Sequence, residues 1–128
     1  MKIEIPQLPP VEFSPNWRGF WRKRYEAGWQ FKADVHYCAL DAKSKEPEFK
    51  TLEYAELKMT FVVKEARIRD ADNWIARMKP GVDALVDAGV IQADDQNHLR
   101  ITSVDFKIDK NIAPMTIVEV SKQAGIEC

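Results

Sequence analysis

Two aspartates stand one residue apart in the segment 69–73, RDADN, directly after a stretch whose alternating pattern predicts a strand. In an extended segment, side chains two residues apart point to the same side, so Asp70 and Asp72 lie roughly 6.5 Å apart at the backbone. Two carboxylates about 4 Å apart repel by roughly 4 kcal/mol at an effective dielectric constant near 20. The pair is therefore expected to be solvated, protonated or bridged by a cation.

A hard divalent cation is one explanation for this pair. Mg²⁺ is usually bound through one or two carboxylates together with waters and substrate phosphates, which fits an Asp-x-Asp at the end of a strand. The later segment 93–95, ADD, offers a third acid. In the alternative explanation, Asp72 or Asn73 only caps the helix that follows, because both residue types are favoured N-caps. Spacing alone favours the cap.

A longer set of residues shares its order with one family of nucleases. The segment 69–95, RDADNWIARMKPGVDALVDAGVIQADD, resembles the signature of the RusA-like Holliday junction resolvases. The shared features are Asp-x-Asp-Asn, a lysine, Asp-Ala-Leu, Ala-Gly-Val and a terminal Asp-Asp. Residues 14–24, SPNWRGFWRKR, are similar to the Asn-x-Arg-x-x-Trp segment that many phage members carry. Together the two stretches extend the resemblance over most of the chain.

The resemblance implies a crossover junction endodeoxyribonuclease that nicks four-way DNA symmetrically in DNA recombination and repair. It implies Mg²⁺ as cofactor, with Mn²⁺ as a substitute and no nucleotide cofactor. Asp70, Asp72 and Asp95 match the metal-binding and catalytic aspartates of the family, with Asp94 as an additional candidate ligand and Asn73 as a supporting residue. A homodimer is implied as well, since two opposed cuts in a nearly two-fold symmetric junction require two active sites.

The catalytic lysine is the one departure from the family pattern. In the family it falls four residues after the second aspartate, where this chain has Ala76, and the best match is Lys79, seven residues after Asp72. Four residues advance about 40° beyond one helical turn and seven fall about 20° short of two, so both positions share a face with Asp72. Arg77 is a weaker candidate. Asp83, which matches the aspartate of Asp-Ala-Leu, would orient Lys79, or the two would form an ordinary exposed ion pair.

The resemblance favours an active junction resolvase. The displaced lysine leaves a second function open, which is a RusA-fold protein that binds branched DNA without cutting it. A purely structural or protein-interaction domain is a third interpretation, which predicts no affinity for branched DNA.

Charge is unevenly distributed along the chain. Residues 14–32 carry five basic side chains against one acid, whereas six acids fall within residues 70–95. The first region suits phosphate and the second suits cations. Contacts to DNA phosphates are expected from six residues: Arg18, Arg22, Lys23, Arg24, Arg69 and Arg77.

The periodicity of apolar residues predicts an α+β fold with the order β-α-β-α-β-β, in which two main helices pack on a mixed sheet. The predicted strands are residues 2–5, 55–63, 98–108 and 114–120. The predicted helices are residues 17–40 and 74–89, and a loop over residues 41–49 follows the first helix. Ser14 or Asn16 would cap the first helix. Pro80 would kink the second helix or divide it at Lys79 and Pro80. The apolar parity changes between residues 101 and 104, which predicts a bulge.

Four aromatic residues in the first predicted helix recur at every fourth position: Trp17, Trp21, Tyr25 and Trp29. A row of large apolar side chains at helical spacing usually faces a core or an interface. We therefore expect these rings in the core or in a dimer interface, and not as platforms on which DNA bases stack.

The composition sets the outer limits of the interpretation. With 128 residues, 45% hydrophobic content and a net charge of −1, the chain suits a single domain over residues 1–128. It contains no apolar run of membrane-spanning length and no signal-peptide pattern, so we expect a cytoplasmic protein without a membrane partner. The resemblance implies that the cell is a bacterium or a phage-infected host. Cys38 and Cys128 are expected to be reduced thiols without a function, and His98 a surface or structural residue.

Overall fold

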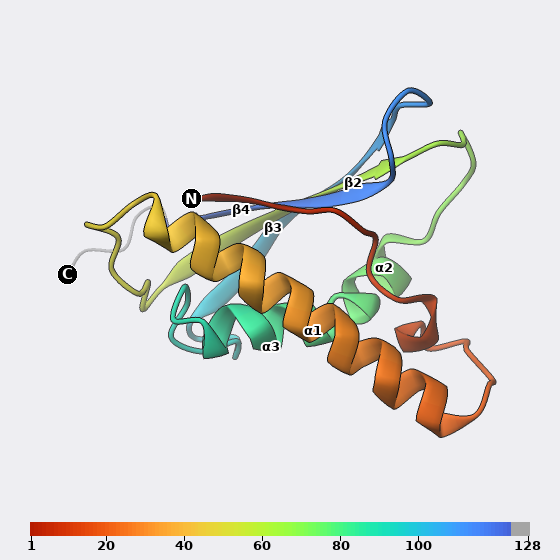
Figure 1. The fold of residues 1–128 in the computed structure, drawn as a ribbon, viewed down its shortest axis with the longest axis horizontal. Coiled ribbons are helices and arrows are strands. Elements are labelled where there is room, and N and C mark those ends of the chain that lie inside the picture. Colours follow the sequence, from red (N-terminus) through yellow and green to blue (C-terminus); the bar gives the residue numbers. More distant parts are fainter. Residues whose placement is uncertain (124–128) are drawn as a thin grey trace.

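The computed structural model describes residues 1–123, which form an α+β domain of three α-helices and a four-stranded mixed sheet (Figure 1). In chain order the elements are β1 (Lys2–Ile5), the short 3-10 helix η1 (Val11–Phe13), α1 (Trp21–Ser44), β2 (Ala55–Val63), α2 (Ala71–Arg77), α3 (Lys79–Asp87), β3 (Leu99–Ile108) and β4 (Met115–Lys122). The predicted fold class and element order are confirmed, with the second helix divided in two.

The sheet has the strand order β1-β4-β2-β3, so that β2 lies in the interior and β1 and β3 form the edges. β2 pairs in parallel with β3 and antiparallel with β4, and β1 pairs antiparallel with β4. In the parallel pair, Leu57 lies opposite Ile101 but Lys58 lies opposite Ser103, which leaves Thr102 as an extra residue. The bulge predicted from the change of apolar parity is confirmed.

The helices cover one face of this sheet, where α1 crosses the strands with α3 beside it (Figure 1). Alternate side chains of β2, at Leu57, Met59 and Phe61, point to that face and are fully buried. Between them, Lys58 is exposed on the other face. The two-layer architecture follows from this alternation, because only one face of the strand is apolar along its first half.

The first helix begins four residues later than predicted and ends four residues later as well. The predicted caps do something else: Ser14 Oγ accepts a hydrogen bond from the Asn16 N–H at 3.3 Å, and the Ser14 carbonyl accepts one from the Trp17 N–H at 3.1 Å. Ser14 therefore closes a local turn and not a helix end, as serine hydroxyls often do. At the other end, residues 41–44 of the predicted loop are helical.

The predicted core position is wrong for three of the four aromatic residues, and their place in a dimer interface stays a prediction. Trp21, Tyr25 and Trp29 are 63%, 59% and 61% exposed, and Trp17 is half-buried in the turn before the helix. The buried face of α1 instead consists of Gly28, Phe31, Val35 and Ala39.

Two small residues on the buried face of α1 make this face hard to identify from the apolar pattern of the sequence. Gly28 and Ala39 let neighbouring elements approach α1 closely, but they add little to an apolar pattern. A Cβ built at Gly28 would lie 2.5 Å from the ring of Phe13, so η1 packs directly on the bare backbone at this position. Gly81 of α3 allows a similarly close approach to α1, because a Cβ at this position would lie 2.8 Å from the ring of Phe31. Close contact, not side-chain size, therefore marks the inner face of α1.

The second predicted helix is divided where Pro80 required it. α2 ends at Arg77, Met78 is fully buried between the two helices, and α3 restarts at Lys79 with Pro80 in its first turn. Proline is tolerated there because the first-turn N–H groups of a helix have no partner within it. Gly89, with φ of 76°, then follows the end of α3 in the left-handed conformation that favours glycine. Within residues 1–123, no helix has the length and apolar character needed to cross a membrane.

Candidate functional site

The first acidic pair lies at the start of α2. Asp70 is the N-cap, and its Oδ1 accepts a hydrogen bond from the Asp72 N–H at 3.0 Å. The predicted cap at Asp72 or Asn73 is therefore wrong by two or three residues. Both aspartate side chains are exposed, and Asp72 stands in the first turn, where the helix dipole favours negative charge.

Lys79 bonds to two of the acids in the segment 70–95. Its Nζ donates to Asp83 Oδ1 at 3.0 Å and to Asp94 Oδ2 at 2.6 Å. The predicted contact with Asp83 is confirmed. The bond to Asp94, which links α3 to the loop before β3, was not predicted, because nothing in the sequence sets the path of that loop. Lys79, Asp83 and Asp94 are called the lysine cluster below.

Charge is fixed within the lysine cluster. The hydrogen bond to Asp94 raises the pKa of Lys79 above its ordinary value, and the bond to Asp83 adds to that effect. In return, Lys79 lowers the pKa of Asp94 below its ordinary value. The ammonium group and the Asp94 carboxylate are therefore both charged at neutral pH.

Acid should weaken the lysine cluster. The folded pKa of Asp94 is depressed, so its contribution to stability is present above the ordinary aspartate pKa and is lost as the pH falls through the folded value. The pKa of Lys79 is raised, so the lysine contribution is lost only when the pH rises through its folded value. Since these side chains are partly exposed, Asp94→Asn should lower the free energy of unfolding by about 0.2–1 kcal/mol at neutral pH. Urea unfolding should show this difference shrinking in acid, and a difference that grows would contradict the assigned pair.

A cavity of about 510 Å³ opens beside the lysine cluster. Besides Lys79 and Asp94, its lining comes from η1, the adjoining turn, the helices and β3: Phe13, Pro15, Arg24, Ile75, Ala76, Val82, Leu99 and Ile101. The cavity therefore brings together Ala76, where the resemblance expects the lysine, and Lys79, where this chain has one. Both positions line the same cavity, Ala76 from α2 and Lys79 from α3. The predicted face shared with Asp72 required one continuous helix, which the structure divides at Met78, and Asp72 does not line the cavity.

Asp95 lies next to the lysine cluster but is held by other groups. Its Oδ1 accepts a hydrogen bond from the Asn97 N–H at 2.9 Å and contacts His98 Nδ1 at 2.7 Å. The hydrogen bond with His98 lowers the pKa of Asp95 below its ordinary value. The His98 ring stacks on Tyr54, with centroids 5.7 Å apart and planes at 3°. His98 therefore contacts a predicted site residue, and its role as a surface or structural residue stays a prediction.

The acidic side chains of this region have different partners. Among residues 1–123, no group of three or more His, Cys, Asp or Glu side chains is arranged to hold a metal ion. Asp94 is paired with Lys79 and Asp95 with His98, whereas Asp70, the N-cap of α2, and Asp72, in its first turn, present exposed carboxylates. An all-oxygen pair of this kind fits Mg²⁺ bound through one or two carboxylates, waters and a phosphate. The roles of Asp94 and Asp95 as ligands stay predictions.

The basic residues before and at the start of α1 are available to a ligand. Arg18, Arg22 and Lys23 are exposed, and within the described part of the chain no carboxylate lies within ion-pair distance of them. Arg24 is more constrained, because it donates to the Glu12 carbonyl at 3.2 Å and lies 4.4 Å from the centre of the Phe13 ring. Phosphate contact by these four residues stays a prediction.

Arg77 and Arg69 have structural partners that the sequence did not indicate. Arg77 is half-buried, lies 3.9 Å from the centre of the Trp74 ring and donates to the Pro9 carbonyl at 3.2 Å through Nε and 2.6 Å through an Nη. Burial lowers the pKa of Arg77. Arg69 donates to the carbonyls of two preceding residues, at 2.9 and 3.3 Å. Both guanidinium groups thus fix the backbone around α2.

Arg77→Met should therefore destabilise the fold more than it weakens DNA binding. The change removes two hydrogen bonds from a charged donor and leaves the Pro9 carbonyl without them, which costs about 1.5–3 kcal/mol. Urea unfolding measures this loss. The slope of DNA affinity against salt should stay unchanged, whereas loss of a phosphate contact would reduce it by about one unit. A flatter slope with unchanged stability would identify Arg77 as a DNA contact.

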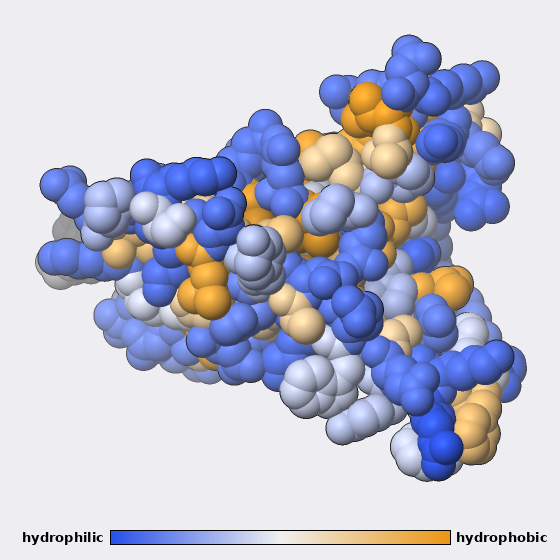
Figure 2. All heavy atoms as spheres, in the orientation of Figure 1, coloured by the Kyte–Doolittle hydropathy of each residue, from blue (hydrophilic) through white to orange (hydrophobic). Residues whose placement is uncertain are grey.

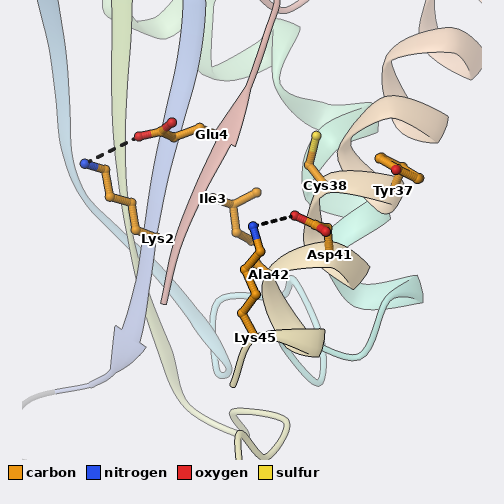
Figure 3. Close-up of a pocket in the computed structure, with 8 residues that line it drawn as sticks. All are labelled: Lys2, Ile3, Glu4, Tyr37, Cys38, Asp41, Ala42 and Lys45. Carbon is orange, nitrogen blue, oxygen red and sulfur yellow. Dashed lines mark ion pairs between the residues drawn. The ribbon is translucent and has the colours of Figure 1, made fainter. Parts of the chain in front are cut away.

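A second cavity, of about 350 Å³, lies between β1 and the C-terminal half of α1 (Figure 3). Its charged side chains pair with each other, Lys2 with Glu4 at 3.7 Å and Lys45 with Asp41 at 3.1 Å. Burial raises the pKa of the Cys38 thiol, which keeps it protonated and a poor nucleophile. The prediction that Cys38 has no function stays a prediction, and Cys128 lies outside the described residues.

The chain was also compared with known proteins. Its sequence matches no family model, and none of the curated proteins matches it.

Proposed function

We propose that this protein is a Mg²⁺-dependent endonuclease that resolves four-way DNA junctions by paired symmetric nicks, as its resemblance to the RusA-like resolvases implies. The observation that carries the proposal is the lysine cluster. Lys79 binds Asp94, fifteen residues further along the chain, at 2.6 Å, so the lysine and the terminal Asp-Asp of the motif meet in space. The lysine of the motif therefore lies against Asp83 and against the terminal Asp-Asp segment, beside a cavity.

Two of the chemical requirements of phosphodiester hydrolysis have candidate residues in this protein. The reaction needs an activated water, stabilisation of charge on the phosphoryl oxygens, and help for the leaving 3′ oxygen. Lys79, held by Asp83 and Asp94, would stabilise the negative charge that develops on the phosphoryl oxygens. Asp70 and Asp72 are the residues that would hold Mg²⁺, which when bound lowers the pKa of a bound water and neutralises phosphate charge.

Binding and symmetry complete the proposal. Arg18, Arg22 and Lys23 offer unpaired positive charge to the phosphate backbone, and loss of each should flatten the salt dependence of binding by roughly one unit. Two copies of the chain on one junction would cut opposed strands, because the junction and a dimer share two-fold symmetry.

A second candidate function is binding of branched DNA without cleavage. It is favoured by one observation, which is that the Lys79 ammonium already has two carboxylate partners in the structure. A lysine neutralised in this way stabilises a phosphate less well unless DNA or metal binding draws the carboxylates away.

Incubation of the protein with a synthetic four-way junction, labelled in turn on each strand, separates the two functions. The proposed enzyme gives symmetric nicks in two opposed strands with Mg²⁺ or Mn²⁺ and none with EDTA. Binding without any nick in either metal would leave only the binding module.

Asp70→Asn tests whether the Asp70 carboxylate is required for cleavage. Asparagine is as good an N-cap as aspartate, so α2 should stay intact while one carboxylate is lost. Cleavage should disappear and binding should persist or tighten, because a charge that repels phosphate is removed. Asp105→Asn, at an exposed position on β3, is the matched control and should cut normally. Normal cutting by Asp70→Asn would show that Asp70 is not in the site.

A further inference from the structure

The N-terminal half of α1 presents three large aromatic rings to solvent. Trp21, Tyr25 and Trp29 are 63%, 59% and 61% exposed, and Trp29 Nε1 donates a hydrogen bond to the Tyr25 hydroxyl at 3.0 Å. This end of the molecule combines strongly hydrophilic surface with paler and apolar surface (Figure 2). Clustered exposed rings of this size mark binding surfaces in folded proteins. The three residues are called the aromatic row below.

A hollow lies at the inner end of the aromatic row. It measures about 220 Å³, sits between α1 and α3, and is lined by Phe13, Tyr25, Gly28, Trp29, Lys32, Pro80 and Asp83. Asp83 also accepts the hydrogen bond from Lys79 at 3.0 Å. The hollow therefore adjoins the lysine cluster, and a group bound against Tyr25 and Trp29 would lie next to the proposed active site.

The charge around the aromatic row selects a polyanion as its partner. Residues 17–29 contain four basic side chains and one acid. The first turn of α1 has no acidic residue and no side-chain cap, and three of the basic side chains stand there. Cations near a helix N-terminus oppose the helix dipole, so helix stability does not explain them. A second copy related by a two-fold axis on this face would bring positive charge against positive charge, whereas nucleic acid is complementary.

The spacing of the rings points to bases that are not stacked on each other. Neighbouring residues of the row are four positions apart, so the Cα atoms that carry the rings are spaced by about 6 Å along the helix axis. Bases stacked in a strand follow each other at about 3.4 Å. Rings at the wider spacing match bases that have separated, and aromatic side chains bind such bases through their faces whatever the sequence.

We propose that the aromatic row and its hollow bind unpaired, unstacked bases of single-stranded DNA, with Arg18, Arg22 and Lys23 holding the phosphates on either side. The inference rests on the proposed function in that it takes DNA as the partner. Such bases occur where strands exchange at a branch. A base held by Tyr25 and Trp29 would place the adjoining backbone beside Asp83 and Lys79.

The test measures the affinity of the purified full chain for a short labelled oligothymidylate. Trp29→Ala should weaken binding about 5- to 150-fold, the range expected for loss of one stacked base. Trp29→Phe, which keeps a ring, should restore most of the affinity. Tyr37→Ala is the matched control, since Tyr37 is 74% exposed on the same helix but lies outside the row, and it should change affinity less than two-fold. Unfolding curves confirm that each variant is folded.

An abasic strand of the same length separates stacking from charge. It keeps the phosphates and lacks the bases, so the native protein should bind it at least as weakly as Trp29→Ala binds oligothymidylate, and Trp29→Ala should bind the abasic strand about as well as the native protein does. Equal affinity of the native protein for both strands would overturn the proposal. So would a concentration-dependent dimer that Trp29→Ala dissociates without any change in strand affinity, because the row would then join two copies of the chain.

Failure of this inference and failure of the proposed function give different results. Junction cleavage with no effect of Trp29→Ala on strand binding refutes the base platform and leaves the nuclease. A base-dependent affinity without cleavage in Mg²⁺ or Mn²⁺ supports the platform and refutes the nuclease.

Discussion

Lys79→Ala is expected to slow cleavage of a four-way junction by about 10²–10³-fold, the usual cost of removing one positioned group that stabilises transition-state charge. Its Nζ is held at 3.0 Å from Asp83 and 2.6 Å from Asp94 beside the cavity, so the ammonium has a defined position. Stability should change little, because exposed ion pairs contribute about 1 kcal/mol or less. Single-turnover cleavage with saturating protein measures the chemical step apart from binding.

Two further variants distinguish a positioned charge from an ordinary ion pair. Lys79→Arg keeps the positive charge but replaces a compact ammonium by a planar fork, and should recover only part of the rate. Lys45→Ala removes a comparable i,i+4 ion pair, in which Lys45 lies 3.1 Å from Asp41 beside the second cavity. This variant should cut normally. An unchanged rate in Lys79→Ala would assign the lysine cluster to the fold alone.

Phe61→Ala should have the largest effect on stability, about 3–5 kcal/mol. Phe61 is fully buried on β2 and packs against Trp74 and Phe106, with ring centroids 4.9 and 5.6 Å away. Trp74 and Phe106 also meet edge to face at 5.2 Å, so the three rings form one cluster. Removing the ring at its centre leaves a cavity between the sheet and α2. For a domain of this size, the thermal midpoint should fall by about 10–20 °C.

Phe61 also belongs to the ring cluster that positions the first turn of α2, where Asp72 lies. Trp74 belongs to α2, two residues after Asp72, so the ring cluster fixes the first turn of α2 against β2 and β3. Phe20→Ala is the matched control, because Phe20 is 57% exposed, and it should shift stability by less than about 0.5 kcal/mol. Calorimetry measures both, and equal losses would contradict the ring cluster as the centre of the core.

The strands and the broken helix were predictable because each depends on local chemistry. Alternation along residues 55–63 requires a half-buried strand, Pro80 cannot continue a helix, and a change of parity between Ile101 and Val104 requires an extra residue, which is Thr102. None of these features depends on what lies elsewhere in the fold.

The inner face of α1 and the partners of the charged residues depend on tertiary contacts. Large rings at every fourth position suggested a buried stripe, but Gly28 and Gly81 let Phe13 and Phe31 pack closely and leave the rings outside. In the candidate site, the Lys79–Asp83 pair follows from helical spacing. The bond from Lys79 to Asp94 depends on the path of the loop before β3, which local patterns do not determine.

The most direct measurement is cleavage of a supercoiled plasmid that extrudes a cruciform. Paired symmetric cuts by two copies of the chain convert the plasmid directly to a linear form, whose ends map to opposed strands at the cruciform base. We expect linear product with Mg²⁺ from the native protein and Asp105→Asn, and none from Asp70→Asn or with EDTA. Binding of the cruciform without any cut, or cuts that Asp70→Asn makes equally well, would contradict the proposed resolvase.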